Sequence, residues 1–188
     1  MNKTDTAILE SLIEAIRSSD DTWFFAEGKV LPSELQTSAV NDLGMSRWSP
    51  MALPKASGAL SVFYTAIPGP LPTLFEQMLL SYCWLSVKIS EVRLFGNPPG
   101  PDLSGFQQEI MRDPYVCPIL FSHGLVEFGK VPAWSYDPMC FDLTRAKTGD
   151  CPIVHVDHES VLIGSQARVI DEVAPSFRVL AERLAQSC

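Results

Sequence analysis

Two histidines and two acids stand close together in the C-terminal part of the chain: His155, Asp157, His158 and Glu159. Imidazole nitrogens and carboxylate oxygens are the groups that bind Zn²⁺ in hydrolases. If the preceding residues form a strand, alternation places His155 and Asp157 on one face. One alternative is therefore a metal-dependent hydrolase built on His155, Asp157 and His158.

A structural interpretation competes with this metal site. No other part of the sequence completes a coordination sphere for His155 and Asp157. At a boundary between a strand and a helix, an acid commonly caps backbone amides and a histidine commonly bonds a carbonyl. We favour the structural interpretation and predict no metal site.

Cysteine could supply a nucleophile, with His123 as the base for Cys140 or Cys151. Each of these cysteines lies within an apolar strand pattern, which predicts a buried and unreactive thiol. The chain has five cysteines, an odd number at wide spacing, so we expect reduced thiols rather than disulfides. The sequence also has no nucleophile elbow, phosphate-binding glycine loop, dinucleotide fingerprint or Cys-x-x-Cys pair. We therefore predict no catalytic residues, no enzyme activity and no cofactor.

The segment Trp134-Ser135-Tyr136-Asp137-Pro138 combines two aromatic residues, an acid and a proline before a strand. This composition suits a rigid turn, and it also suits a contact surface. Several acids follow in the same half of the chain, and they form a negative patch if the strands bring them to one face; separate solvated positions are the alternative. The candidate partner-binding residues are Trp134, Tyr136, Asp137, Asp142, Asp150, Asp157 and Glu159.

These residues must be positioned by elements that the hydrophobic pattern predicts. Helical spacing of apolar residues predicts helices over residues 5–18, 33–43, 73–82, 102–111 and 175–186. Apolar, β-branched and aromatic runs predict strands over residues 59–66, 87–95, 116–121, 125–129, 139–143 and 152–156. A capping box of Thr73 and Glu76 marks the third helix, and Pro175 begins the last one. The expected fold class is α+β, with a mostly antiparallel meander flanked by N-terminal, middle and C-terminal helices.

Length and charge restrict the possible partners. The 188 residues, 46% of them hydrophobic, suit a single domain. Fourteen basic against 22 acidic side chains give a net charge of −8, which repels nucleic acid and favours a basic protein partner. The N-terminus lacks the pattern of a signal peptide, and no apolar run approaches the roughly 18 to 20 residues of a membrane span. We expect a cytoplasmic protein; the sequence leaves its oligomeric state open.

Four segments together resemble the SUKH superfamily, whose members include a regulator of cell-wall synthesis and bacterial immunity proteins. The segments are Leu71-Pro72-x-x-Phe75-Glu76-x-x-Leu79-x-x-Tyr82, Leu94-Phe95-Gly96-Asn97, Ser135-Tyr136-Asp137-Pro138-x-Cys140-Phe141-Asp142 and Pro152-Ile153-Val154-x-x-Asp157-His158-Glu159. The resemblance covers residues 60–186, ends in the helix that follows Ala174-Pro175-Ser176-Phe177, and leaves residues 1–58 as an N-terminal helical extension. It implies an α+β scaffold that binds other proteins without catalysis.

Three functions remain as hypotheses. The first is an immunity protein that blocks a basic, nuclease-like toxin through salt-sensitive binding. The second is a regulatory or scaffold protein that binds an endogenous enzyme through Trp134 and Tyr136 and tolerates moderate salt. The third is the metal-dependent hydrolase described above.

Overall fold

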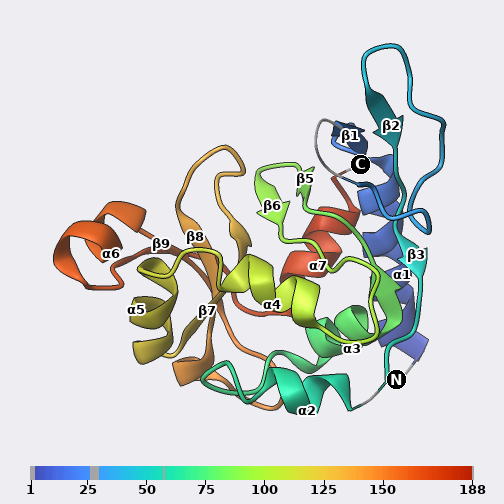
Figure 1. The fold of residues 1–188 in the computed structure, drawn as a ribbon. Coiled ribbons are helices and arrows are strands. Elements are labelled where there is room, and N and C mark those ends of the chain that lie inside the picture. Colours follow the sequence, from blue (N-terminus) through green and yellow to red (C-terminus); the bar gives the residue numbers. More distant parts are fainter. Residues whose placement is uncertain (1–2, 26–29, 57, 188) are drawn as a thin grey trace.

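The computed structural model describes residues 3–25, 30–56 and 58–187 as an α+β fold (Figure 1). Its helices are α1 (Lys3–Ser18), α2 (Ala59–Phe63), α3 (Thr73–Ser81), α4 (Ser104–Ile110), α5 (Val116–Ser122), α6 (His158–Gly164) and α7 (Phe177–Ala185), with a 3₁₀ turn η1 (Leu143–Arg145). Its strands are β1 (Trp23–Phe25), β2 (Met45–Arg47), β3 (Met51–Ala52), β4 (Tyr82–Cys83), β5 (Val87–Ile89), β6 (Val92–Leu94), β7 (Leu125–Lys130), β8 (Pro138–Asp142), β9 (Ile153–Val156) and β10 (Val169–Ala174).

The main sheet is an antiparallel meander in the order β10-β9-β8-β7-β6-β5, so each of its strands pairs with its neighbours in sequence. Two short antiparallel pairs, β1 with β2 and β3 with β4, lie outside it. The predicted fold class, an α+β protein with a mostly antiparallel meander, is confirmed. No helix within the described ranges is both long and apolar enough to cross a membrane.

Helices cover both faces of this sheet. One hydrophobic cluster runs from Ile8 to Leu184 and joins α1, α3 and α7 to the sheet. Phe75 of α3 lies at its centre, with ring centroids 5.0 Å from Phe141 and 4.9 Å from Phe177. On the other face, α5 and α6 pack over β7, β8 and β9 through a smaller cluster that includes Leu120 and Val161. The alternation of side chains in the strands supplies both clusters.

Helices α1 and α7 lie side by side and run in the same direction (Figure 1). Their first turns are joined by an ion pair between Asp5 and Arg178. The predicted stripe of α1 is confirmed, since Leu9, Leu12 and Ile16 are all buried. The N-terminal helix therefore contributes to the same hydrophobic cluster as the later elements.

Two predicted strands are helices. The strand predicted over residues 59–66 is α2, in which Ala59 and Phe63 are buried at a spacing of four while Val62 is exposed. The strand predicted over residues 116–121 is α5, which the Asp113 carboxylate starts by accepting hydrogen bonds from the N–H groups of Tyr115 and Val116. Packing and capping thus outweigh the β propensity of these side chains.

Other boundaries also differ from the prediction. Residues 33–43 contain no helix, and residues 87–95 form the β5–β6 hairpin around Ser90 and Glu91 instead of one bulged strand. The Thr73–Glu76 capping box is wrong: Thr73 donates its N–H to the Gly149 carbonyl, and Glu76 bonds the Tyr64 hydroxyl. The last helix begins at Phe177 and not at Pro175, because the intervening Ser176 is its N-cap and accepts from the Val179 N–H. The pattern also missed α6 and β10.

Candidate protein-binding surface

The loop of residues 131–137, here called the aromatic loop, connects β7 to β8 and is tied down along its length. The Val131 N–H donates to the Asp137 carbonyl at 3.3 Å, and the Ser135 N–H donates to the Pro132 carbonyl at 2.9 Å. Lys130 Nζ donates to the Tyr136 carbonyl at 2.9 Å. These bonds within and beside the loop fix its backbone.

The aromatic loop presents two large rings to solvent. The residues Trp134 and Tyr136 are each 78% exposed. The Tyr136 ring stacks on the imidazole of His158 at the start of α6, with centroids 5.8 Å apart and an interplanar angle of 28°. Exposed rings on an anchored loop lose little conformational entropy when a partner covers them.

Asp137 joins the aromatic loop to the sheet. Its carboxylate accepts a 3.1 Å hydrogen bond from the His158 N–H and lies 3.3 Å from Nε2 of His155. Nδ1 of His155 lies in turn 3.3 Å from the Asp171 carboxylate on β10. The imidazole of His155 therefore lies between two carboxylates, which links the aromatic loop, β9 and β10 at one end of the sheet.

The five candidate acids do not form one patch. Because β8 and β9 are antiparallel neighbours, residues before β8 and after β9 share one end of the sheet, and residues between them share the other. Asp137, Asp157 and Glu159 therefore lie at the end that carries the aromatic loop, and Asp142 and Asp150 lie at the opposite end. Of the two alternatives that the sequence leaves open, the single negative patch over all five acids is therefore not the one that forms.

The carboxylates of Asp142 and Asp150 make hydrogen bonds within the protein. Asp142 is 7% exposed and binds Thr144 and Arg145. Burial raises the pKa of its carboxyl, but the hydrogen bonds from Thr144 and Arg145 outweigh burial and hold the pKa below its ordinary value. Asp150 accepts hydrogen bonds from the N–H groups of Cys151 and Phe177. These contacts occupy both carboxylates within the protein.

The residues of the hypothetical metal site do not converge. The carboxylate of Asp157 caps α6 by accepting from the Glu159 N–H at 3.0 Å, and it pairs with Arg168. His155 faces Asp137 and Asp171, and the ring of His158 stacks on Tyr136. Across the part of the chain that the structure describes, no group of three or more His, Cys, Asp or Glu is placed to hold a metal ion. An acid caps the start of this helix, as expected, whereas the two histidines contact Asp137, Asp171 and Tyr136 instead of the expected backbone carbonyl.

The cysteines lie in apolar surroundings. Cys83, Cys117, Cys140 and Cys151 are free thiols and buried, as predicted for Cys140 and Cys151, whereas Cys188 lies outside the described residues. Burial raises the pKa of the Cys151 thiol to about 12 and that of Cys140 well above its usual range. Nδ1 of His123, the suggested base, lies 2.9 Å from the Ile119 carbonyl at the end of α5.

His123 and Glu159 line an open pocket of about 740 Å³, which is bordered by α6, residues 166–168 and the residue that follows α5. Asp157 and Arg168, which line it too, are paired with each other. The pocket thus borders the start of α6, next to the aromatic loop.

Comparison with known proteins adds no relative. No protein-family model matches the sequence, and a search of curated proteins finds no match. The resemblance to the SUKH superfamily therefore rests on its sequence motifs.

Proposed function

We propose that this protein is a non-catalytic binding module, and that it acts as a cytoplasmic bacterial immunity protein which neutralises a toxin by direct binding. The observation that carries the proposal is the exposure of Trp134 and Tyr136 on an anchored loop. Aromatic side chains at the centre of an interface supply much of its binding energy. The net charge of −8 favours a basic partner, and the resemblance to the SUKH superfamily favours an immunity role.

The experiment is affinity capture from the source cells with two variant proteins. The Trp134→Ala/Tyr136→Ala variant removes both rings. The Leu43→Ala/Val62→Ala variant removes two other exposed apolar side chains, 70% and 66% exposed, from elsewhere on the surface. We expect one stoichiometric partner with the wild type and with the control, and a loss of that partner with the aromatic variant. Equal capture by all three proteins, or no partner with the wild type, contradicts the proposal.

The purified partner then separates an immunity protein from a regulator. For an immunity protein, the partner alone stops growth of a test strain, co-expression of the wild-type chain restores growth, and co-expression of the aromatic variant does not. Binding should also weaken as salt rises, since charge complementarity steers a basic partner. A harmless partner whose binding survives moderate salt identifies instead a scaffold for an endogenous enzyme.

A further inference from the structure

A groove opens at the end of the sheet that carries the aromatic loop. One part, of about 480 Å³, lies between the β5–β6 turn, β10 and the end of α7. A second part, of about 520 Å³, continues from Ser90, Glu91 and Ser187, which line both parts, to the residues after α1. Figure 1 shows the aromatic loop, the β5–β6 turn and β1 along this same end of the molecule.

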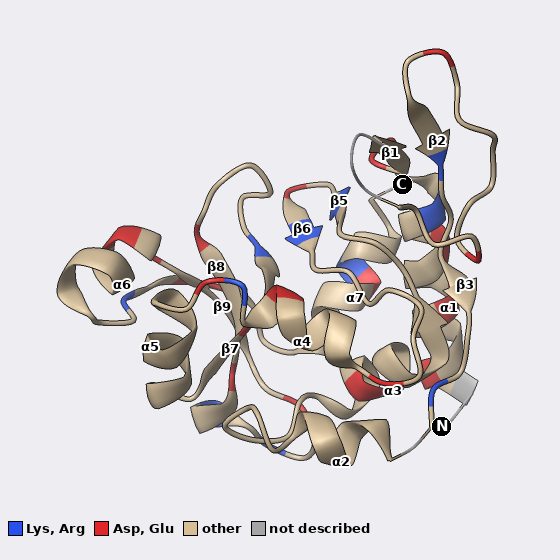
Figure 2. Cartoon of the chain, viewed as in Figure 1, with Lys and Arg blue, Asp and Glu red and all other residues tan. Residues whose placement is uncertain are grey.

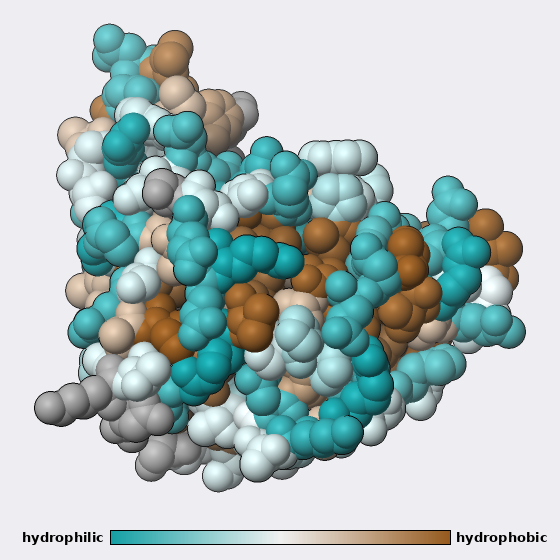
Figure 3. All heavy atoms as spheres, turned by 180° about the vertical axis from the view of Figure 1, so that it is seen from behind, coloured by the Kyte–Doolittle hydropathy of each residue, from teal (hydrophilic) through white to brown (hydrophobic). Residues whose placement is uncertain are grey.

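The walls of this groove are acidic and its floor is apolar. The acids are Asp20, Asp21, Glu91, Asp171 and Glu172, and we call the whole feature the acidic groove. Val92, Val131, Val173 and Leu184 line its first part. Acidic positions are visible at the β5–β6 turn and beside β1 (Figure 2). The rear view shows hydrophobic side chains at the surface among hydrophilic ones (Figure 3).

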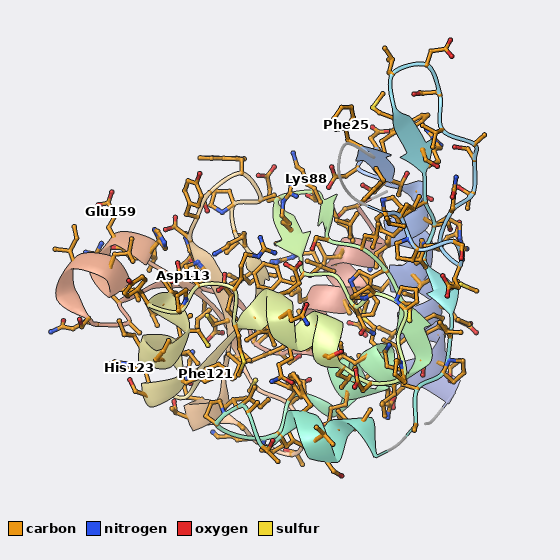
Figure 4. The ribbon with its side chains drawn as sticks, in the orientation of Figure 1. Phe25, Lys88, Asp113, Phe121, His123 and Glu159 are labelled. Carbon is orange, nitrogen blue, oxygen red and sulfur yellow. The ribbon has the colours of Figure 1, made fainter. Side chains whose placement is uncertain are left out.

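The negative charge of the acidic groove is only partly balanced within the protein. Asp171 lies beside His155, and Glu172 pairs with Arg145 at 2.9 Å. Asp21 lies 4.0 Å from the Arg93 guanidinium, whereas the ion pairs among the residues the structure describes include neither Asp20 nor Glu91. Of the two basic residues that line the groove, Arg183 donates to the Val173 carbonyl, and Lys88 points outward at the edge of the hairpin (Figure 4).

The groove does not suit a partner that binds by adding a strand to the edge of the sheet. β10 is one of the two outer strands of the sheet, and its pairing with β9 is interrupted twice, between Val169 and Asp171 and between Glu172 and Ala174. Such bulges bend an edge away from another strand, and acids at the edge repel a second copy. In β5, the other outer strand, the Lys88 N–H donates to the Asp21 carboxylate and the Lys88 carbonyl accepts from the Ser19 hydroxyl. An occupant must therefore be held by its side chains.

From this geometry we infer that the acidic groove binds an extended basic segment of the protein partner. Lysine or arginine side chains of the segment reach Asp20 and Glu91, which belong to none of the ion pairs above, and its apolar side chains lie on the floor formed by Val131 and Val173. Trp134 lies beside the acidic groove, because the aromatic loop is hydrogen-bonded to the β5–β6 turn. This inference rests on the proposed function, which it deepens by naming the chemistry of the partner.

A peptide tests the groove without the natural partner. The probe is an eight-residue peptide of alternating leucine and arginine, titrated into the ¹⁵N-labelled full chain at low salt and followed by amide chemical shifts. Its counterpart has glutamate in place of arginine. We expect shifts of the Ser90, Glu91, Val173 and Arg183 amides with the basic peptide and none with the acidic one. Shifts spread evenly over the surface, or none, overturn the inference.

Charge reversal supplies the matched control. Asp20→Lys/Glu91→Lys reverses two exposed acids of the groove, and Glu34→Lys/Asp42→Lys reverses two exposed acids that do not line it. Both variants carry the same net charge, so general electrostatic attraction falls equally. We expect the groove variant to bind the basic peptide at least about tenfold more weakly than the control, with unchanged thermal unfolding in both. Equal losses of affinity in the two variants contradict specific binding of the peptide in the acidic groove.

The two proposals fail differently. If capture of the partner requires Trp134 and Tyr136 but not Asp20 and Glu91, the proposed binding function is supported and the acidic groove is not the binding site. If the basic peptide binds the acidic groove but no partner is captured from cells, the groove is a binding site for basic segments and the proposed function is wrong.

Discussion

The main-chain N–H of Ala133 donates a 2.7 Å hydrogen bond to the carbonyl oxygen of Glu91. Ala133 immediately precedes the exposed Trp134, and Glu91 lies in the β5–β6 turn. Nε of Arg93 donates to the Ala133 carbonyl at 3.3 Å, so this residue is held through both of its backbone groups. The aromatic loop and the hairpin therefore share one rim of the acidic groove.

Replacing Arg93 should loosen this rim. In Arg93→Ala, the Ala133 carbonyl loses its donor, and we expect the Ala133 amide to exchange its hydrogen about tenfold faster, equivalent to about 1.4 kcal/mol of local stability. Hydrogen exchange followed by NMR measures this. The amide of Val154 in β9 should not change. Arg47→Ala is the control, because Arg47 lies over the Trp23 ring instead. An unchanged Ala133 rate contradicts the proposed role of Arg93.

Leu79 tests the predicted inner face of α3. The side chain is fully buried in the main hydrophobic cluster, so Leu79→Ala should lower the free energy of unfolding by about 2 to 5 kcal/mol through lost contacts and a residual cavity. Denaturant titration measures the loss. Leu43→Ala, at a site that is 70% exposed, should change it by less than about 0.5 kcal/mol. Similar values for both variants contradict the packing described.

Four of the predicted helices, α1, α3, α4 and α7, are confirmed, and each buries apolar residues at helical spacing. Their boundaries were predicted within a few residues. α2 and α5 are too short for a clear period and rich in β-branched or aromatic residues. One signal for α5 was nevertheless present: Asp113 followed by Pro114 is a typical helix start, and Asp113 does cap this helix.

The candidate site was predicted in part. The aromatic loop follows from its composition, and the separation of Asp137 from Asp142 follows from the meander itself, because the two ends of one strand point to opposite ends of the sheet. Asp171 and Glu172 were missed with β10, whose outward-facing residues are exposed and show no buried alternation. The contribution of Asp20 depends on contacts between distant segments, which a local pattern does not contain.

Gly129 should tolerate no side chain. It lies in β7 between β6 and β8, and an added Cβ would lie 2.2 Å from the Arg93 carbonyl oxygen and 2.8 Å from Cε of Met139. Gly129→Ala should therefore destabilise the protein by about 1 to 3 kcal/mol or more, because backbone atoms must shift. Gly164→Ala is the control, since a Cβ there meets no atom within 4 Å. Thermal unfolding of the two variants compares them; equal midpoints contradict the close approach of β6.

The lowered pKa of the Asp142 carboxyl predicts that the protein loses stability in acid. Its pKa is lower in the folded protein than in the unfolded chain, so its carboxylate stabilises the fold above the ordinary value of about 3.9, and this contribution is lost as pH falls through the folded-state pKa. Asp142→Asn should be less stable than the wild type by about 1 to 3 kcal/mol near pH 7, with the gap closing in strong acid. Denaturation at a series of pH values checks this, with the exposed Asp42→Asn as control. A gap that is constant with pH contradicts the assignment.

The raised pKa of the Glu127 carboxyl predicts the opposite dependence of stability on pH. It is 6% exposed beneath α5, opposite Cys140 in the β7–β8 pair, and its carboxylate contacts Lys130. Burial raises the pKa of this carboxyl despite the attraction of Lys130. The folded state therefore holds the proton more tightly than the unfolded chain, and its stability falls as pH rises from the ordinary glutamate value of about 4.3 through the raised one.

Glu127→Gln removes this titration while keeping the size of the side chain. Its stability relative to the wild type should increase as pH rises above about 4, the window in which the wild type must ionise a buried acid. Only this slope is diagnostic, because the loss of the Lys130 contact shifts the difference equally at every pH where Lys130 is charged. The exposed Glu34→Gln should show no such slope. If the difference between Glu127→Gln and the wild type is flat from pH 4 to pH 8, the buried carboxylate does not resist ionisation and the account of its burial is wrong.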